Sequence, residues 1–400
     1  MKRVWPLLIC LFLGLGLAQE LTLDLDKSLT LQETALIESL AASPSDDNVR
    51  FALGITQFLR TVEMLGQTWY RYGLESRIGQ QAGIPFLRLP VPPNPSPATI
   101  SYGDLRGELD ALSERLALAE STLASLQGGD PAVVLDLNEV YLDYDGDAQP
   151  DDGESLLVII ELLNARFTST GQTLELRFDV GDAHWLRGYS HLLMALLEII
   201  LAHDSQTLFS YTAQLFFPRA EVATGLLYEQ GNLLDFDDGE LIDQLALVHL
   251  ALRVPLLEPE RLEKALSHAQ AVTEQAGLMW AAILAETDND REWIPNPRQD
   301  AVLGAEVTQD IVDAWLLFVE ETRALWRGEK LIPHWRLPEG QGINLPRVFL
   351  EPTDFDLVLW LQGGIIEPYA EAGEVISVET LESIWRVFGG EFIGFALWFN

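Results

Sequence analysis

The stretch from His184 to His203 reads HWLRGYSHLLMALLEIILAH, and its apolar residues recur at intervals of three and four. This spacing is typical of an α-helix with one apolar side. Asp182, just before the stretch, is a residue type that caps the first turn of a helix. The same periodicity predicts further helices over residues 31–40, 49–72, 105–126, 155–164, 241–252, 259–285, 308–326 and 378–388. We therefore expect a mainly α fold, a multi-helix globular array.

Several segments interrupt the helical pattern. Residues 133–142 and 174–180 alternate apolar and polar side chains, which predicts short strands that pair in one small sheet. The proline-rich stretch 85–97 (PFLRLPVPPNPSP) favours an extended path that either straps the surface or separates two lobes. Irregular segments follow at 288–299 and 331–352. We expect one mainly helical domain over residues 19–400, and its length allows two lobes because single cores tend to divide above about 250–300 residues.

The first 18 residues predict a signal peptide. Lys2 and Arg3 precede an apolar run over residues 7–17, and Gly16 and Ala18 are small residues at the positions that a signal peptidase reads. This apolar run is about half the ~20 residues that a transmembrane helix needs, and no later segment stays apolar and uncharged for that length. We therefore expect a secreted or periplasmic protein with no transmembrane segment after signal cleavage.

Cysteine and charge narrow the class of protein further. The single cysteine, Cys10, lies inside the signal's apolar run, too early for the lipid-modified cysteine of a lipoprotein, so no disulfide is expected in the mature chain. The formal net charge is −36, and it becomes −38 when Lys2 and Arg3 are removed. Such a charge repels nucleic acid and attracts divalent cations and basic partners. Because 48% of the residues are hydrophobic, the chain has a large core and is no disordered acidic tail.

Residues 143–154 (DYDGDAQPDDGE) place carboxylates at positions 1, 3, 5, 9 and 12 of a twelve-residue loop. This spacing resembles that of the EF-hand calcium loop, and the resemblance covers these residues only. It implies a Ca²⁺ site in which Asp143, Asp145 and Asp147 each give one oxygen and Asp151 binds directly or through water. Gln149 would give its backbone carbonyl oxygen, and Glu154 both carboxylate oxygens.

Two residues depart from the EF-hand pattern. Position 6, which is normally glycine, is Ala148, so it must take an unfavourable positive φ or force a different backbone path. Position 8, usually an apolar residue that pairs with a second hand, is Pro150, and the residues before the loop predict a strand. We expect a solitary strand-loop-helix site, with residues 153–164 as the exiting helix, in which calcium stabilises more than it signals. The alternative is an acidic turn exposed to solvent.

The helix at 184–203 also carries a polar stripe, because His184, Arg187, His191 and Glu198 lie close to one face. As a catalytic pocket, the stripe would use His191 as an acid, a base or a metal ligand, and Arg187 to hold an anion. As packing, it would be a lattice of salt bridges and hydrogen bonds between helices. We favour the lattice, because the two-histidine, one-glutamate spacing of a zinc protease helix is absent and no other catalytic motif appears.

Three other segments combine charged or aromatic residues in short stretches. The acids of residues 235–240 (DFDDGE) lack metal-loop spacing and are expected to cap the helix that follows. Residues 292–299 (EWIPNPRQ) either form one wall of a cleft or pin a long loop to the core, and the aromatic tail 392–399 is expected to be a buried anchor. The leading hypothesis is thus an exported calcium-binding protein. The alternatives are an envelope enzyme of hydrolase or lyase type with a pocket around His191 and Arg187, and an acidic scaffold for a basic protein partner.

Overall fold

The computed structural model describes residues 20–23, 28–75, 87, 89–163, 174–222, 238–304, 307–377, 382 and 387. The expected signal peptide and aromatic tail lie outside these residues, and so does the expected helix at 378–388, apart from residues 382 and 387. Over the described residues the chain is mainly α-helical, as the periodicity predicts.

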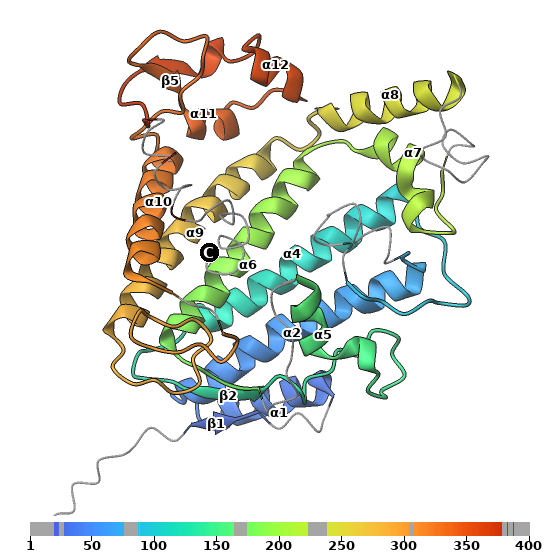
Figure 1. Ribbon diagram of the computed structural model, residues 1–400. Helices are drawn as coiled ribbons and strands as arrows, with labels where there is room; N and C mark the ends of the chain where they lie inside the picture. The colour runs from blue at the N-terminus through green and yellow to red at the C-terminus, as the bar shows by residue number, and fades with distance from the viewer. Residues whose placement is uncertain are drawn as a thin grey trace, which may run out of the picture.

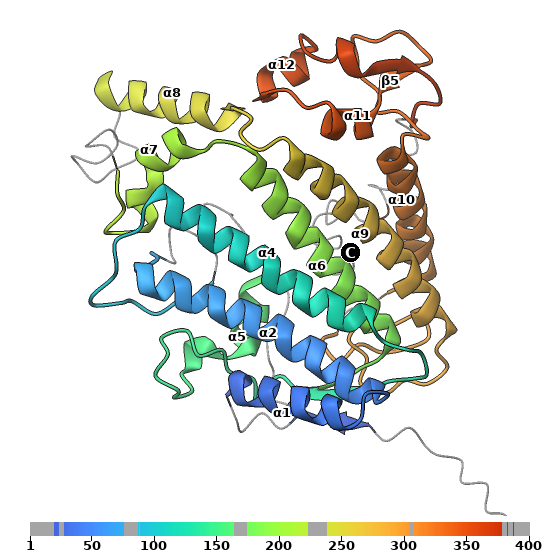
Figure 2. The same ribbon diagram turned by 180° about the vertical axis from the view of Figure 1, so that it is seen from behind.

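Six long helices form the body of the molecule. Each one packs against the next, and Figures 1 and 2 show them as a continuous layer of neighbouring helices. In spatial order they are α1 (Leu29–Ala42), α2 (Asp47–Tyr72), α4 (Tyr102–Ala124), α6 (Val180–Ala202), α9 (Glu260–Ala285) and α10 (Gln309–Arg327). The helix α6, which was predicted at residues 184–203, thus lies between α4 and α9, and its most extensive contact is with α9.

Shorter helices lie around this layer. The expected ones are α5 (Leu156–Leu163) and α8 (Asp238–Leu252). The periodicity did not predict α7 (Gln206–Phe216), α11 (Leu345–Leu350) or α12 (Leu357–Gln362). In α7 the aromatic and β-branched residues hide the helical pattern, because these residue types also favour strands. The two others have six residues each, too few for a helical period to be visible.

A small sheet lies beside the first helices. Its strands β1 (Leu21–Thr22), β2 (Val133–Asp136) and β3 (Glu175–Phe178) are arranged in that order. The pairing of β2 with β3 is antiparallel, with Val134 opposite Arg177, so the expected two-stranded sheet is confirmed. The parallel strand β1 extends it and was not expected. Two further pairs of short strands are β4 (Arg253–Val254) with β6 (Phe355–Asp356) and β5 (Gln341–Ile343) with β7 (Ala370–Ala372).

The buried hydrophobic residues form several clusters. The largest joins the helical layer to the small sheet and contains Phe51, Trp280 and Trp315. A second surrounds Trp69 and includes Leu89 and Val91 of the proline-rich stretch, whose described residues form no α-helix and no strand. That stretch therefore straps a buried patch, one of the two roles that the sequence allowed.

The start of α6 corrects one expectation. The helix begins at Val180, and its cap is Asp179, whose Oδ1 accepts a hydrogen bond of 2.8 Å from the backbone N–H of Gly181. Asp182 lies in the first turn, and its Oδ2 accepts from the N–H of Asp179 at 3.0 Å. The two side chains thus form a capping box. The helix therefore begins earlier than predicted, because two aspartates three residues apart satisfy more free backbone amides than one does.

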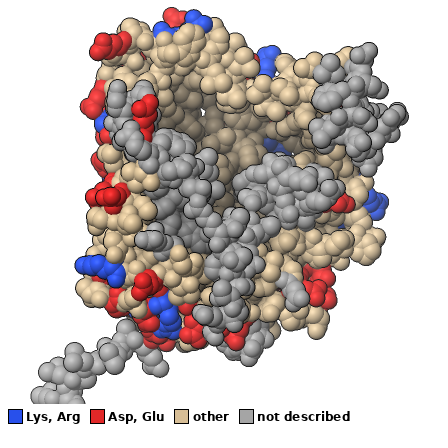
Figure 3. All heavy atoms as spheres, in the orientation of Figure 1, with Lys and Arg blue, Asp and Glu red and all other residues tan. Residues whose placement is uncertain are grey.

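Among the described helices, α6 alone is long and apolar enough to cross a membrane, by length and composition. Half of the residues in its most apolar stretch are buried within the molecule. On the face shown in Figure 3, Asp and Glu side chains gather along the edge where α10 lies and around the end that holds β2, with Lys and Arg between them.

Candidate metal centre

The ends of the loop at residues 143–154 are tied together. The N–H of Leu142 donates to the carbonyl oxygen of Glu154, and the N–H of Leu156 donates to that of Val140, each at 2.9 Å. Tyr141 and Ser155 form an antiparallel bridge between these bonds. The chain then leaves through a 3₁₀ turn, η2 (Asp152–Glu154), and α5. The helix predicted after the loop is present as α5, but the strand predicted up to residue 142 ends at Asp136, and residues 137–139 form a turn before the single bridge at Tyr141.

Tyr144 anchors the loop to α2. Its side chain is fully buried, and its ring lies so close to Gly66 that a Cβ there would be 1.9 Å from a ring carbon. Two other α2 side chains hold the backbone of Asp143: Gln67 Nε2 donates to its carbonyl oxygen at 2.8 Å, and Glu63 Oε1 accepts from its N–H at 3.3 Å. Burial raises the pKa of Glu63. This attachment was not predictable from the sequence, because α2 is distant along the chain.

Three of the expected ligands converge. Carboxylate oxygens of Asp143, Asp145 and Asp147 all lie within 4.8 Å of one another. Two oxygens that are each about 2.3–2.6 Å from one Ca²⁺ ion can be at most about 5 Å apart, so this separation fits a shared ion. Within the described residues, no lysine or arginine pairs with these three carboxylates. The donor set is oxygen only, which hard cations such as Ca²⁺ prefer.

Backbone amides orient the three carboxylates. The N–H groups of Gly146 and Ala148 donate to Oδ1 and Oδ2 of Asp143 at 2.7 and 3.2 Å. The next amides along the loop do the same for its neighbours, with 3.0 Å from Asp147 N to Asp145 Oδ1 and 2.7 Å from Gln149 N to Asp147 Oδ1. Each aspartate is therefore held in place by a hydrogen bond within the loop.

Ala148 has a φ of 58°, in the left-handed region that favours glycine. This is the first of the two outcomes that the sequence allowed: the loop keeps its path, and alanine adopts an unfavourable backbone conformation. The cost of that conformation for a residue with a Cβ is about 1–2 kcal/mol. Gly146, two residues earlier, has a φ of 78° and carries no such penalty.

The remaining ligand candidates are arranged differently. Glu154 is only 2% exposed, and its carboxylate accepts from the N–H of Tyr144 at 2.6 Å and from that of Asp151 at 3.4 Å. Burial raises the pKa of Glu154, and the nearby charge of Asp145 adds to that effect. Asp151 and Gln149 are exposed. The group of three converging carboxylates includes neither Asp151 nor Glu154.

The catalytic candidates His191 and Arg187 meet at Glu120 of α4. Arg187 Nε donates to Glu120 Oε1 at 2.9 Å, and His191 Nε2 lies 3.4 Å from the same oxygen. On the other side, His191 Nδ1 lies 3.0 Å from Nδ1 of His268 on α9. Burial opposes ionisation of Glu120, but the contacts with His191 and Arg187 outweigh it and lower its pKa to about 2. The pKa of His268 falls to about 4, through burial and the neighbouring His191.

Glu198, the third catalytic candidate, belongs to a separate network. Arg261 of α9 reaches it through Nη1 at 3.1 Å, and the same guanidinium reaches Asp110 of α4 through Nη2 at 2.7 Å. His184 belongs to neither network, because its Nδ1 lies 2.8 Å from Oε1 of Gln275 on α9. The stripe on α6 is therefore divided among three sets of contacts, two of which tie α4, α6 and α9 together. This arrangement favours the packing interpretation over a single catalytic pocket. Glu120, His268 and Arg261 lie on other helices, where one sequence gives no sign of their meeting.

The segment at 292–299 is pinned to the core. Trp293 is buried, with its ring centroid 5.9 Å from that of Phe178 and 5.4 Å from that of Trp185. Asn296 is 1% exposed and donates to the carbonyl oxygen of Ile283 at 2.9 Å. This segment also brings the buried carboxyl of Glu292 next to acids of other elements, which sequence analysis did not anticipate.

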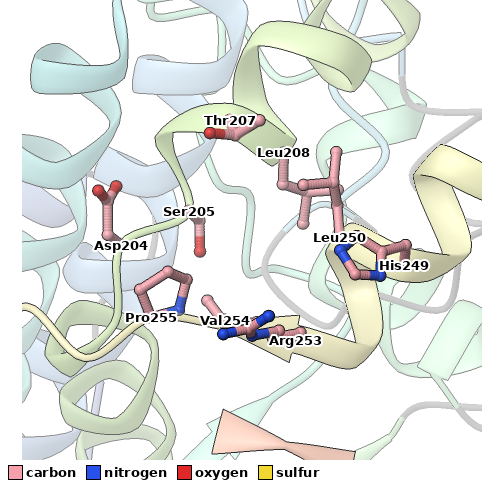
Figure 4. A pocket seen from close by; sticks show the side chains of 9 residues that line it. All are labelled: Asp204, Ser205, Thr207, Leu208, His249, Leu250, Arg253, Val254 and Pro255. Atoms are coloured by element: carbon pink, nitrogen blue, oxygen red, sulfur yellow. The ribbon is translucent and has the colours of Figure 1, made fainter. Parts of the chain in front are cut away.

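A cavity of about 230 Å³ lies where α7 begins and α8 meets β4. Figure 4 shows Ser205 opposite Val254 and Arg253, with His249 and Leu250 on the side of α8. The cavity is smaller than the ~300–1,000 Å³ of most small-molecule sites, and none of the residues singled out from the sequence lines it.

Comparisons of the chain with protein-family models, with curated proteins and with solved structures found no match.

Proposed function

We propose that the protein is an exported calcium-binding protein and that the loop at residues 143–154 holds one structural Ca²⁺ ion. The observation that carries this proposal is the convergence of the Asp143, Asp145 and Asp147 carboxylates within 4.8 Å. At an effective dielectric constant of about 20, two carboxylates ~5 Å apart repel each other by roughly 3 kcal/mol. A divalent cation replaces that repulsion with attraction.

The ion would act as a clamp on the loop. Asp143 is attached to α2, and the far end of the loop leads into α5, so a cation between the aspartates would fix α5 relative to α2. Asp151 would contribute directly or through water, and Gln149 through its carbonyl. Glu154 would contribute by exchanging its hydrogen bonds with the Tyr144 and Asp151 amides for the ion.

Calcium suits this loop better than magnesium does. Mg²⁺ demands a near-ideal octahedron at about 2.0–2.1 Å, whereas Ca²⁺ accepts six to eight oxygens in a flexible arrangement. The strain at Ala148 is expected to weaken binding, and extracellular calcium modules often have Kd values of ~10⁻⁴ to 10⁻³ M. Such an affinity suits a stabilising ion in a calcium-rich compartment.

Calorimetric titration of metal-stripped mature protein tests the proposal. We expect Ca²⁺ to bind at one site and to raise the melting temperature, because an ion that binds only the folded state stabilises it. Asp143→Ala and Glu154→Gln should abolish both effects. Glu139→Gln, which removes an exposed acid just before the loop, is the control and should bind like the unaltered protein. Unchanged binding heats in both loop variants would contradict the site assignment.

A further inference from the structure

A second group of acids lies where the N-terminal end of α6 meets the C-terminal end of α9. Carboxylate oxygens of Asp179, Glu286 and Glu292 lie within 4.8 Å of one another, and Asp182 adjoins them through the capping box. The exposed fractions of Asp179, Asp182 and Glu292 are only 7%, 5% and 3%. Glu286 ends α9, and Glu292 belongs to the segment at 286–304, so the group joins that segment to α6.

The surroundings offer little positive charge. Arg177 of β3 is the cation in contact, with its Nη1 3.4 Å from Asp179 Oδ2, and it is shared with Glu20 at 3.0 Å. Two other arginines of the segment lie nearby. Arg291 pairs with acids outside the group, and Arg298 Nη2 donates to the backbone carbonyl oxygens of Leu284 and Glu286, not to a carboxylate of the group. The charged groups around the four carboxyls are therefore Arg177, Arg291, Arg298, Glu20, Asp130, Asp288 and Asp290.

Neutral donors complete the contacts. Gln299 Nε2 lies 3.1 Å from Glu286 Oε2 and 3.0 Å from Glu292 Oε1, so it bridges the two glutamates. The N–H of Asp290 also donates to Glu292 Oε1 at 2.9 Å. These amide donors carry no net charge, and one shared arginine cannot neutralise the three buried carboxylates together with the half-buried one of Glu286. Because charge buried without a partner is strongly unfavourable, some of these carboxyls must keep their protons for the segment to stay docked.

We propose that Asp179, Asp182, Glu286 and Glu292 form a proton-operated latch that fastens the segment at 286–304 to the start of α6. With protons on the carboxyls the latch is closed. When all four ionise, their mutual repulsion releases the segment from α6 and β3. The contacts that would open include the N–H of Arg177 to the carbonyl oxygen of Arg291, at 3.0 Å, and the packing of Trp293 against Phe178.

The direction of the pH effect follows from the same groups. Burial raises the pKa of Glu286 to about 8, and burial together with the charge of Asp179 raises the pKa of Asp182 well above its usual range. A carboxyl whose pKa is higher in the folded state than in the unfolded state, about 4.3 for glutamate, binds its proton more tightly when folded. Its contribution to stability is complete below the unfolded pKa and is lost as the pH rises through about 8.

Hydrogen exchange of the full mature chain, measured by mass spectrometry in EDTA between pH 6 and 9, tests the latch. EDTA keeps the calcium loop in one state throughout, so failure of the calcium proposal leaves this test unaffected. After correction for intrinsic exchange rates, we expect protection of residues 286–304 to fall at least tenfold between pH 6.5 and 9, while α2 keeps its protection. The N–H of Val302, which donates to the carbonyl oxygen of Glu292, is a direct reporter.

Glu286→Gln and Glu292→Gln imitate the protonated carboxyl with little change of shape. In each variant the segment should stay protected at pH 9, and two variants guard against the failure of one to fold. The control is Glu339→Gln, which alters an exposed acid outside the proposed latch and should behave like the unaltered protein. Protection of 286–304 that is independent of pH, or an alkaline loss that is the same in both glutamine variants as in the unaltered protein, would overturn the proposal.

Discussion

At the scale of single residues, Ala148 shows how much of the candidate site the sequence could predict. Position 6 of the loop requires a left-handed backbone, and the sequence alone indicated that alanine must either adopt it or redirect the chain. The structure gives it a φ of 58°, so the local rule held. The role of Glu154 was less predictable, because its hydrogen bonds to the Tyr144 and Asp151 amides depend on how the loop closes.

Replacing Ala148 with glycine removes the backbone strain. Ala148→Gly should raise the free energy of unfolding by up to about 1 kcal/mol, because the left-handed penalty of 1–2 kcal/mol is partly offset by the greater entropy of glycine in the unfolded chain. Urea denaturation in saturating Ca²⁺ measures the change. As a control, Ala119→Gly within α4 should lower the free energy of unfolding by a similar amount or more, since Ala119 is buried in a regular helix. A loss of stability in both variants would show that Ala148 is not strained.

At the scale of elements, periodicity predicted the long helices and the β2–β3 pair because each buries one face, and that burial leaves a repeating pattern in the sequence. It missed α11 and α12, which are too short to show a period, and placed the start of α6 at Asp182 when Asp179 caps it. Contacts between elements were not predictable from a single sequence. The attachment of the loop to α2 through Tyr144 is the clearest case, because it depends on the space at Gly66, and a single glycine leaves no periodic pattern in the sequence.

Gly66→Ala tests that attachment. The new methyl group would lie 1.9 Å from the Tyr144 ring, so the ring must move, and we expect a loss of about 1–3 kcal/mol in the free energy of unfolding, as in other overpacked cores. Calcium binding should weaken as well, because Tyr144 lies between the two proposed ligands Asp143 and Asp145. The matched control is Gly107→Ala in α4, where no atom lies within 4 Å of the added Cβ.

Gly107→Ala should stabilise the protein by about 0.5–1 kcal/mol, because alanine is the better helix former. Chemical denaturation and calcium titration of both variants would measure the two effects together. Equal stabilities for the two glycine variants, with unchanged calcium affinity in Gly66→Ala, would show that Tyr144 does not couple the loop to α2.

At the scale of the whole molecule, composition predicted a folded, acidic protein and periodicity a helical one, and the structure shows how the acids are distributed. Some form interhelical ion pairs, such as Glu120 with Arg187 and Glu198 with Arg261. Others converge with little positive charge nearby, at the loop of residues 143–154 and at the start of α6. The sequence could predict the group in the loop, whose members are close along the chain, and could not predict the group at α6, whose members come from two segments about 100 residues apart.

The acidic scaffold and the envelope enzyme remain predictions from the sequence. The partition of His191, Arg187 and Glu198 between two interhelical networks gives the enzyme hypothesis less support than the convergence of aspartates gives calcium. Calcium binding is therefore the central claim at this scale.

A crystal structure of the mature protein grown with millimolar calcium tests it most directly. We predict one strong density peak about 2.3–2.6 Å from carboxylate oxygens of Asp143, Asp145 and Asp147, with the Gln149 carbonyl and the Glu154 carboxylate turned toward it. A well-ordered loop at 143–154 without such a peak, or with its three aspartates turned apart into solvent, would contradict the claim.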